Sequence, residues 1–586
     1  MSLQHQPLLP FCCYDKAIKK IVIRLVCGKE LTPVTVIYGD PYNYRESGRL
    51  DKAGKKIWDW VYEEAAPRKQ YSGGCQAVWQ AELPSPQYGR LKYAFILEDE
   101  NGKRLYYGDN GLMEDTVENK NDPHNQFFLP YAHEADALDI PQWAGDVVWY
   151  QIFPERFCNG NPSISPAGTE DWETGEPMYD SFFGGDLYGI IEKLPYIKSL
   201  GATGLYLTPI FKSPTTHKYT TQDYFTVDEH FGDKETLKKL VSKAHELGMK
   251  VMLDAVFNHI GSKHMFWQDV LANQENSQYK DYFHIHSFPV LESYEDRNEL
   301  NYDTYGFYHN MPKWNTENPA ARKYLIEAAL YWIRECGIDG WRLDASDDVS
   351  FSFWREFKSA ITAYKKDFYI LGEIWYNPSK WLDNGYFDAV TNYSLSREIR
   401  DFFLGKNPNP DEFTRKLFGK ITRYSDMHSR IQLNLMDSHD TARVLTQADG
   451  NKLALKNAFL FMFLMRGAPC LYYGTEIGME GANDPDCRRP MIWDKKRQDL
   501  ELLEFFKRLI ALRKEHNILV QNAAVSYTTI GGLCCWTLAY GGEEVDIMYN
   551  SGSEEVEIKA DILLATHTCE NNALPAKTIA VCSSKK

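Results

Sequence analysis

The feature that most constrains the fold is a regular alternation of short apolar segments and longer helix-like segments between residues 147 and 474. Each apolar segment has the length of a buried strand, and several helix-like segments end at glycine, which commonly stops a helix. Strands that alternate with helices in this way are typical of a parallel sheet. Eight such units predict an α/β fold, the (β/α)8 TIM barrel. The apolar segments are residues 147–153, 204–211, 250–257, 340–346, 368–375, 388–393, 431–438 and 468–474.

The segments before and after the barrel have a different pattern. Apolar and polar residues alternate there, and Gly, Asp-Pro and Asn-Gly turns punctuate them, which indicates strands joined by tight turns. We therefore predict an N-terminal β-sandwich over residues 1–138, the (β/α)8 barrel over residues 139–518 and a small C-terminal β-domain over residues 519–586. After the third predicted strand, the aromatic and proline-containing residues 260–312 predict an inserted lid domain.

Composition excludes several classes of partner. The net charge of −16 argues against nucleic acids and anionic membrane surfaces, because both require a basic face. The chain has no apolar run of about 18 residues, and its N-terminus has neither a basic leader nor a full apolar segment, so we expect no membrane span and a cytoplasmic location. The 12 cysteines are scattered without the spacing of metal ligands, which favours reduced thiols and leaves disulfides open.

Charged side chains follow the predicted strands at their carboxyl ends, where TIM barrels carry their chemistry. Four carboxylates at one rim repel one another, so fold stability alone would disfavour this arrangement. A single aspartate at a strand end is usually a helix cap or a turn residue, but four carboxylates in His-, Arg- or Trp-containing motifs indicate an active site. The residues are Asp254 and His259 after the third strand, Arg342 and Asp344 on the fourth, Glu373 at the end of the fifth, and His439 and Asp440 at the end of the seventh.

The fourth and fifth strands provide a pair of carboxyl groups with a predictable separation. Neighbouring strands lie about 4.8 Å apart. The carboxyl groups of Asp344 and Glu373 should therefore lie near the roughly 5–5.5 Å separation of retaining glycosidases, short of the roughly 6.5–9.5 Å of inverting ones. One carboxylate can then attack an anomeric carbon while the other protonates the leaving oxygen. Residues i and i+2 of a strand share a face, so Arg342 should lie beside Asp344 and keep it ionised and aimed.

Motifs along most of the chain resemble those of glycoside hydrolase family 13, the α-amylase family. The family's four signature regions occur in order as DAVFNH (254–259), GWRLDASDD (340–348), GEIW (372–375) and DSHD (437–440). Further motifs resemble the subgroup of neopullulanases, cyclomaltodextrinases and maltogenic amylases, including its N-terminal starch-binding-like β-domain. These motifs are residues 39–44, 149–157, 181–190, 207–211, 217–224, 311–315 and 484–493, the first of them in the predicted N-terminal domain.

The resemblance implies a retaining α-glucan hydrolase that cleaves α-1,4-glucosidic bonds of cyclomaltodextrins, pullulan and maltooligosaccharides. By position, Asp344 would be the nucleophile and Glu373 the general acid/base. Asp440 would be the third carboxylate, which binds ring hydroxyls and stabilises the transition state. A glycosyl–Asp344 ester would form and then be attacked by water or by a sugar hydroxyl, in a double displacement.

The resemblance also implies a set of binding residues. Asp254 is expected to orient Arg342 rather than to touch substrate. Trp375 follows the acid and either lines the acceptor side or packs in the core. The implied binding residues are His259, Arg342 and His439 around the reacting sugar, Tyr219 stacked beneath it, and Asp484 and Arg488 at the neighbouring sugar.

A calcium site is implied by the resemblance and weakened by the residues present. In the subgroup, the loop after the first strand supplies ligands together with a Gly-Gly-Asp segment, and oxygen-rich loops suit Ca²⁺. Ile164 and Ser165 stand where Asn and Asp are expected, which removes one side-chain ligand and one negative charge, so occupancy stays open. The candidate ligands are Asn159, Asn161, Ser165, the Gly184 carbonyl and Asp186.

The N-terminal domain of this subgroup often closes the cleft of a partner subunit, so the resemblance implies a homodimer. Two alternatives compete with the enzyme. A catalytically dead, amylase-like carbohydrate-binding protein would have lost catalytic carboxylates, which are present here, and a metal-dependent barrel hydrolase would need clustered histidines, which are absent from the sequence. Residues 345–348 and Trp314 depart from the subgroup's pattern near the acceptor side, so the preferred substrate and the balance of hydrolysis and transfer stay open.

Overall fold

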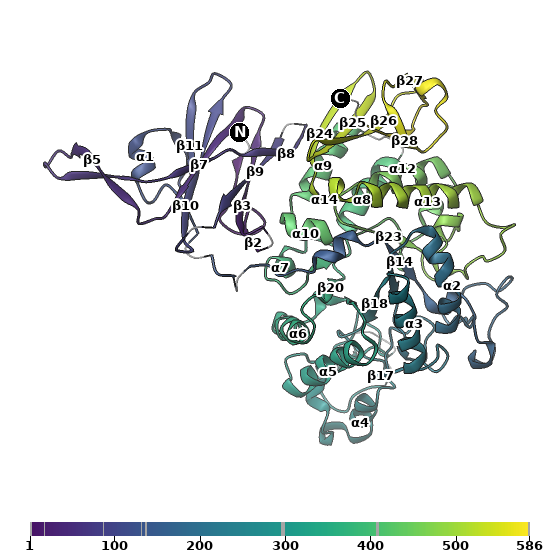
Figure 1. Cartoon of the computed structure of the whole chain (residues 1–586). Helices are drawn as coiled ribbons and strands as arrows, with labels where there is room; N and C mark the ends of the chain where they lie inside the picture. Colours follow the sequence, from purple (N-terminus) through teal and green to yellow (C-terminus); the bar gives the residue numbers. More distant parts are fainter. Residues whose placement is uncertain are drawn as a thin grey trace. The chain divides into compact units, whose positions relative to one another are not determined.

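The computed structural model describes residues 3–16, 18–74, 76–85, 87–129, 132–134, 137–292, 294, 299–405 and 409–583. The chain divides into two compact units, whose elements are labelled in Figure 1. The barrel unit comprises Pro141–Lys406 and Arg430–Asn517. The β unit comprises Met1–Ile140, Asn407–Ser429 and Ile518–Lys586.

The barrel unit is built on a parallel sheet. Its strands are β14 (Trp149–Ile152), β15 (Gly204–Leu207), β18 (Lys250–Ala255), β19 (Gly340–Leu343), β20 (Tyr369–Gly372), β21 (Ala389–Val390), β22 (Leu433–Leu435) and β23 (Ala468–Tyr472). Among the described residues this sheet has eight strands in the order β21-β20-β19-β18-β15-β14-β23-β22. A parallel bridge between Thr391 and Leu433 joins its two ends, which closes the sheet. The predicted (β/α)8 barrel is confirmed, and each predicted apolar segment contains one of these strands.

Local sequence signals begin and end the helices of this unit. Asp186 caps α2 (Leu187–Leu200), which ends at Gly201 in the left-handed conformation. Asn318 caps α5 (Pro319–Cys336), which ends at Gly337 in the same conformation. The unit also contains α3 (Lys234–Glu246), α4 (Met265–Asn273), α6 (Phe351–Tyr364), α7 (Ser379–Leu382), α8 (Tyr393–Phe403), α11 (Val444–Gln447), α12 (Lys452–Phe463) and α13 (Leu500–Glu515). Among the described helices, none combines the length and the apolar character that a membrane span requires.

Strands from both ends of the chain make up the β unit. The N-terminal strands are β1 (Leu3–Gln4), β2 (Cys12–Asp15), β3 (Lys20–Gly28), β4 (Leu31–Gly39), β5 (Tyr44–Leu50), β6 (Lys56–Trp60), β7 (Glu63–Ala65), β8 (Arg68–Gly73), β9 (Gln76–Pro84), β10 (Leu91–Asp99), β11 (Arg104–Gly108), β12 (Gly111–Glu114) and β13 (Phe127–Leu129). The C-terminal strands are β24 (Ala524–Ile530), β25 (Leu533–Tyr540), β26 (Glu543–Asn550), β27 (Val556–Glu557), β28 (Asp561–Ala565), β29 (Ala573–Leu574) and β30 (Ile579–Ser583). The remaining described helices are α1 (Val117–Asn121), α9 (Pro410–Ile421), α10 (Asp426–Ile431) and α14 (Asn517–Asn522).

Two sheets dominate the β unit. One has the order β1-β3-β9-β8-β24-β25-β26-β30-β28, with β2 beside β3. The other has the order β12-β11-β10-β4-β7, with β13 beside β10. Parallel pairing of β24 with β8 places Val525 opposite Tyr71, so strands from the two ends of the chain continue a single sheet. The local alternation of residues does not reveal this pairing.

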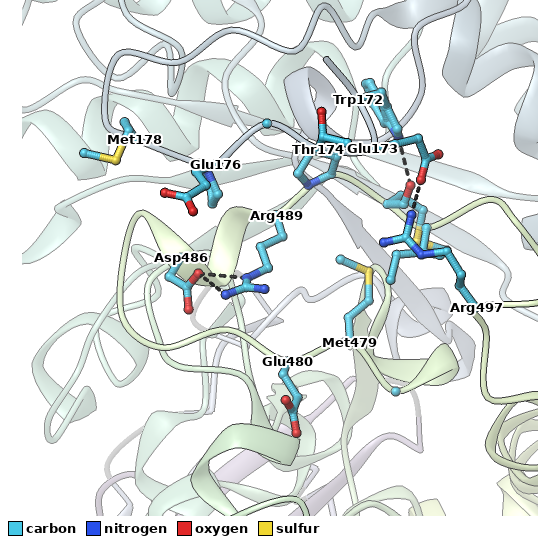
Figure 2. Close-up of a pocket in the computed structure, with 16 residues that line it drawn as sticks. Trp172, Glu173, Thr174, Glu176, Met178, Met479, Glu480, Asp486, Arg489 and Arg497 are labelled. Carbon is cyan, nitrogen blue, oxygen red and sulfur yellow. Dashed lines mark hydrogen bonds and ion pairs between the residues drawn. The ribbon is translucent and has the colours of Figure 1, made fainter. Parts of the chain in front are cut away.

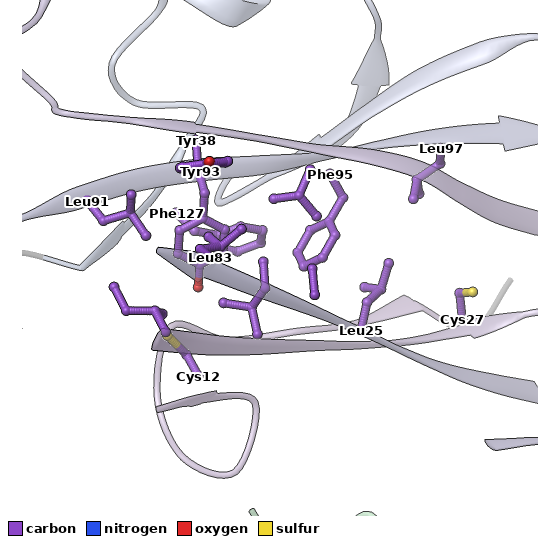
Figure 3. Packing of buried hydrophobic residues seen from close by; sticks show 14 of the residues in the cluster. Cys12, Leu25, Cys27, Tyr38, Leu83, Leu91, Tyr93, Phe95, Leu97 and Phe127 are labelled. Atoms are coloured by element: carbon purple, nitrogen blue, oxygen red, sulfur yellow. The ribbon is translucent and has the colours of Figure 1, made fainter. Parts of the chain in front are cut away.

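The core of the N-terminal sandwich packs alternate residues of facing strands (Figure 3). Leu25 and Cys27 of β3 and Phe95 and Leu97 of β10 belong to this core, because residues two apart in a strand share a face. Burial of each large apolar side chain contributes about 1.5–3 kcal/mol. Burial also raises the pKa of the Cys12 thiol to about 11, so it stays protonated at neutral pH. All described cysteines are free, and Cys75 lies outside the described residues.

The predicted insertion after β18 has an aromatic core of its own. Trp267 of α4 contacts Tyr302 with ring centroids 4.6 Å apart, and Phe283 stacks on Trp314 at 5.1 Å. Trp314 is buried, and its Nε1 donates to Tyr224 Oη at 3.1 Å. The sequence placed Trp314 near the acceptor side; its ring is buried against aromatic side chains of the insertion, such as Phe283, and of the barrel, such as Tyr324 of α5.

His264, the N-cap of α4, makes stability depend on pH. Its Nδ1 accepts a hydrogen bond from Phe266 N at 3.2 Å, and burial lowers its pKa from 6.5 to about 4. Between pH 6.5 and pH 4, His264 is protonated in the unfolded chain but not in the folded chain. The stabilisation of the folded state by the neutral His264 cap is therefore fully present above pH 6.5 and is lost as the pH falls toward 4. His264→Asn keeps a capping group that does not titrate.

Between pH 7.5 and pH 5 we expect the wild-type protein to lose about 2 kcal/mol of unfolding free energy relative to the His264→Asn variant. Urea unfolding at the two pH values measures this difference. A difference between the two proteins that does not change with pH would contradict the assignment of a buried neutral imidazole.

Candidate active site

A cleft of about 530 Å³ opens at the carboxyl ends of the barrel strands. It is lined by eight of the residues that the sequence predicted, namely Tyr219, His259, Asp344, Glu373, Trp375, Asp440, Asp484 and Arg488. Two more predicted residues, Arg342 and His439, lie beneath the lining and are each only 1% exposed. The remaining lining residues are Tyr179, His217, Tyr305, Tyr308, Asn310 and Met311.

One arginine, Arg342, contacts all the carboxylates at the floor of the cleft. The parallel register pairs it, on β19, with Asp254 of β18. Its Nη1 is 2.6 Å from Asp344 Oδ1 and 3.0 Å from both carboxylate oxygens of Asp254. Its Nη2 is 2.9 Å from Glu373 Oε1 and 3.8 Å from Asp440 Oδ2. Asp344 and Glu373 therefore face one cleft and share one guanidinium group, and Asp254 orients Arg342 from below.

Two carboxyl groups of this cluster, those of Asp344 and Asp254, hold protons more strongly than exposed carboxyl groups do. Burial raises the pKa of Asp344 well above its usual range; Arg342 opposes this effect and Glu373 adds to it. Burial also raises the pKa of Asp254 to about 7, again against Arg342. The sequence predicted that Arg342 would keep Asp344 ionised. Arg342 acts in that direction, while burial and the neighbouring carboxylates act against it.

Three donors orient the carboxylate of Glu373. Its Oε1 lies 2.9 Å from Arg342 Nη2 and accepts a hydrogen bond from Trp375 Nε1 at 3.1 Å. Its Oε2 accepts a hydrogen bond from the backbone N–H of Ala345 at 3.0 Å. Ala345 has a φ of +42°, a left-handed conformation that is uncommon for a residue with a Cβ atom. The turn after β19 thus helps to position the carboxylate on the neighbouring strand.

Two further predicted residues present groups to the cleft. Trp375 is 43% exposed and stacks on Tyr393 with ring centroids 3.7 Å apart, so it faces the cleft rather than the core. His259 is held by Asn258 Oδ1, 3.1 Å from its Nδ1, and stacks on Tyr305. Among the described residues its buried Nε2 has no hydrogen-bond partner, which leaves that atom for a ligand. Burial lowers the pKa of His259 to about 3, so the ring is neutral.

A chain of hydrogen bonds runs behind the cleft from Gln151 to Asp254. Gln151 Nε2 lies 2.9 Å from His439 Nδ1, and His439 Nε2 lies 2.5 Å from Tyr219 Oη. Tyr219 Oη donates to Asp254 Oδ2 at 3.1 Å. Burial lowers the pKa of His439 well below its usual value, so the ring carries one proton. With the Gln151 amide as donor to Nδ1, that proton is on Nε2 and faces Tyr219 Oη.

Gln151→Met tests whether this amide sets the tautomer of His439. The variant keeps the side-chain volume but leaves His439 Nδ1 without its donor, which costs about 1–3 kcal/mol for a buried polar group. We expect kcat/KM to fall about 10- to 100-fold, with a larger change in kcat than in KM, because Tyr219 loses its fixed position. Steady-state kinetics on a maltooligosaccharide measures this, and unchanged kcat/KM in a folded variant would refute it.

Comparison with known proteins gives the same result as the geometry. Residues 151–522 match the model of the alpha amylase catalytic domain, and residues 1–133 match that of the alpha amylase N-terminal ig-like domain. The chain belongs to the alpha-amylase family. It is thus a glycoside hydrolase, as the motifs predicted.

Relatives of this family member cover almost its whole length. A cyclomaltodextrinase of Geobacillus thermopakistaniensis is 43% identical over 94% of the chain and 91% of its own length. An intracellular maltogenic amylase of Bacillus subtilis is 42% identical over 90% of the chain and 87% of its own length. A solved structure of a cyclomaltodextrinase matches 100% of the chain and 99% of its own with a TM-score of 0.87 and 36% identity. The predicted subgroup of the alpha-amylase family is therefore confirmed.

The cleft of this alpha-amylase family member contains residues that sequence reasoning missed. His217 stacks on Tyr219 with ring centroids 5.8 Å apart. It is the first residue of the motif at residues 217–224, which also contains Tyr219. Tyr305 comes from the insertion and stacks on His259 at 4.9 Å. Its only signal was the aromatic composition of that segment. Gln151 lies in the motif at residues 149–157, but the motif alone did not connect it with His439.

Asp484 and Arg488 form one edge of the cleft. Arg488 Nη1 is 3.0 Å from Asp484 Oδ1, and Arg488 Nη2 is 3.4 Å from Asp440 Oδ1. Burial raises the pKa of Asp484, with Arg488 acting against this effect. The hydroxyl of Tyr179 donates to the backbone oxygen of Asp484 at 3.1 Å, which ties this edge to a second segment of the barrel unit.

The Asp186 carboxylate in the loop expected to bind calcium is occupied by hydrogen bonds from the protein. Its Oδ1 accepts from Gly160 N at 3.2 Å and from Gly189 N at 2.7 Å. Its Oδ2 accepts from Asn161 N at 2.7 Å. Asn161 Oδ1 in turn accepts from the hydroxyl of Ser163 at 2.7 Å. Two of the predicted ligands thus hold the loop itself.

The other predicted calcium ligands lie close together but supply no charge. Asn159 Nδ2 donates to Ser165 Oγ at 3.0 Å, and a Cβ atom on Gly184 would come within 2.5 Å of that hydroxyl. Asn159 Oδ1 is buried without a hydrogen-bond partner among the described residues. Ca²⁺ takes roughly six to eight oxygens, so an ion here would need backbone carbonyls and waters in addition to these side chains.

Proposed function

We propose that the protein is a retaining α-glucan hydrolase that cleaves α-1,4-glucosidic bonds of cyclomaltodextrins, pullulan and maltooligosaccharides. The observation that carries this proposal is the convergence of Asp344 and Glu373 on Arg342 at the floor of one cleft. Its relatives include a cyclomaltodextrinase, an intracellular maltogenic amylase and a neopullulanase 2, which supports the substrate class. A catalytically dead binding protein is not favoured, because all three carboxylates line the cleft.

The proposed reaction is a double displacement. Asp344 Oδ1 is held by Arg342, which leaves the other oxygen to attack the anomeric carbon as the glycosidic bond breaks. Glu373 gives its proton to the leaving oxygen, and a glycosyl–Asp344 ester forms. Water, or a sugar hydroxyl in transglycosylation, then attacks the ester and returns a proton to Glu373. Asp440 binds ring hydroxyls and stabilises the charge that develops in the transition state.

Product analysis tests this proposal. Equal amounts of β-cyclodextrin, pullulan and soluble starch are digested, and products are separated while NMR follows the anomeric configuration. We expect retained configuration, panose from pullulan, and faster turnover of cyclodextrin than of starch. Inverted configuration would refute the two-step mechanism, and activity on starch alone would refute the substrate class.

We further propose that the protein is a cytoplasmic homodimer. Support comes from the match of residues 1–133 to the N-terminal domain model and from a relative named as intracellular. Sedimentation equilibrium tests the dimer, and a monomer at micromolar concentration would refute that part without touching the chemistry.

We propose that the enzyme does not depend on calcium, since the hydrogen bonds of Asp186 already close the loop. We expect excess EDTA to leave the melting temperature and kcat unchanged. Calorimetric titration with Ca²⁺ should release no binding heat. A fall in melting temperature on chelation that Ca²⁺ reverses would contradict this expectation and restore the site.

A further inference from the structure

A second cavity, shown in Figure 2, takes no part in the proposed reaction. We call it the second pocket; its wall consists of residues 172–178, 478–480, 486, 489–492 and 497. Its volume of about 690 Å³ exceeds the 530 Å³ of the cleft, and the two cavities share no lining residue. Cavities of roughly 300–1,000 Å³ are the usual size of small-molecule sites.

The second pocket and the cleft are lined by neighbouring residues of the same two chain segments. Within one short segment, Asp484 and Arg488 line the cleft, whereas Asp486 and Arg489 line the second pocket. Tyr179 lines the cleft while its neighbour in sequence lines the second pocket, and its hydroxyl donates to the backbone oxygen of Asp484. A ligand in the second pocket would therefore contact the same chain segment that contacts a ligand in the cleft.

The polar groups of the second pocket suit a neutral ligand rather than an anion. Asp486 pairs with Arg489 at 2.6 Å, and Glu173 pairs with Arg497. Glu176 and Glu480 also line the wall and have no ion-pair partner among the described residues (Figure 2). Four carboxylates face two guanidinium groups, so an anion would be repelled. Carboxylate acceptors and guanidinium donors together match hydroxyl groups, which both donate and accept.

The pocket also has an apolar part. Trp172 is held by a hydrogen bond from its Nε1 to the backbone oxygen of Met491 at 3.0 Å, so its ring has a fixed orientation. Met178 and Met479 lie in the same wall (Figure 2). An indole ring and thioethers provide contacts for the C–H faces of a sugar ring, whose edges carry hydroxyl groups. The wall thus combines the two kinds of surface that an oligosaccharide presents.

We propose that the second pocket binds an α-glucan segment separate from the one in the cleft. The ligand class rests on the proposed function, since an enzyme that acts on α-glucans meets this neutral, hydroxyl-rich ligand at high concentration. Arg489 and Asp486 hydrogen-bond its hydroxyl groups, and Trp172 contacts a ring face.

Calorimetric titration of the full chain with maltoheptaose tests the inference. The Asp344→Asn variant serves as the background, because it should bind without turnover. We expect that adding Arg489→Ala or Trp172→Ala removes one binding site per chain. Arg489 has a half-exposed side chain, so its truncation should not disturb folding. The matched control is Lys495→Ala, an exposed cation outside the pocket wall, which should keep every site.

If the Arg489→Ala and Trp172→Ala variants bind as many maltoheptaose molecules per chain as the Lys495→Ala variant, the proposed second site is refuted. A cleft variant separates this result from a failure of the proposed function. Arg488→Ala on the same background should remove the cleft site and leave the second one. If only the Arg488→Ala change affects binding, the proposed function stands and the second site falls. If the Asp344→Asn background binds no glucan, both fall.

Discussion

Asp344→Asn and Glu373→Gln should each lower kcat by about four orders of magnitude or more, as removal of a nucleophile or acid does in other hydrolases. Asparagine cannot form the glycosyl ester, and glutamine cannot give a proton to the leaving oxygen. Both substitutions keep the size and shape of the side chain. Steady-state kinetics on β-cyclodextrin measures the loss, and circular dichroism should show an unchanged fold.

A matched control for these variants is Asp367→Asn, which changes an exposed aspartate just before β20. It should leave kcat within about threefold of the wild-type value, because surface substitutions change little. Near-normal activity of Asp344→Asn or Glu373→Gln would remove the assignment. Loss of activity in all three variants would indicate damage to the barrel instead.

Arg342→Met should lower both stability and activity. Arg342 and Asp254 are both buried, and breaking a buried ion pair by removing one partner costs about 3–5 kcal/mol. Without the guanidinium group, the pKa values of Asp344 and Asp254 should rise further, because Arg342 is the group that lowers them. The nucleophile would then be protonated at neutral pH, and the residual activity should increase with rising pH.

Urea unfolding and a pH–rate profile measure these two effects. Arg342→Lys keeps a positive charge but cannot span the carboxylates with two nitrogen atoms, so it should lie between the wild-type and Arg342→Met proteins. An unchanged pH profile in Arg342→Met would mean that the cation does not control the ionisation of Asp344.

Local sequence was enough to predict the barrel and its chemistry. Apolar segments of strand length, helix caps such as Asp186 and helix stops such as Gly201 are properties of short stretches. Once the barrel was predicted, Asp344 and Glu373 had to emerge at one rim, because parallel strands end on the same side. The strand and helix patterns and the positions of the carboxylates therefore predict the same barrel without any knowledge of its contacts.

Other features depended on contacts between distant segments. Pairing of β8 with β24 joins strands whose local patterns are alike, so the pattern could not select the partner. Trp314 was expected near the acceptor side, and its burial depends on aromatic side chains from separate segments, such as Phe283 and Tyr324. Gln151 acts through His439, and the motif in which it lies does not indicate that contact.

By itself, the sequence determined the fold class, the family and the residues at the rim of the barrel, because these follow from periodicity and from residue type at strand ends. The pKa values of these residues depend on the tertiary structure and could not be predicted from the sequence. Burial raises the pKa of Asp344 although Arg342 lies 2.6 Å away, since desolvation depends on every atom that surrounds the site. The second pocket also depends on the tertiary structure, because its wall consists of two segments that lie far apart in the sequence.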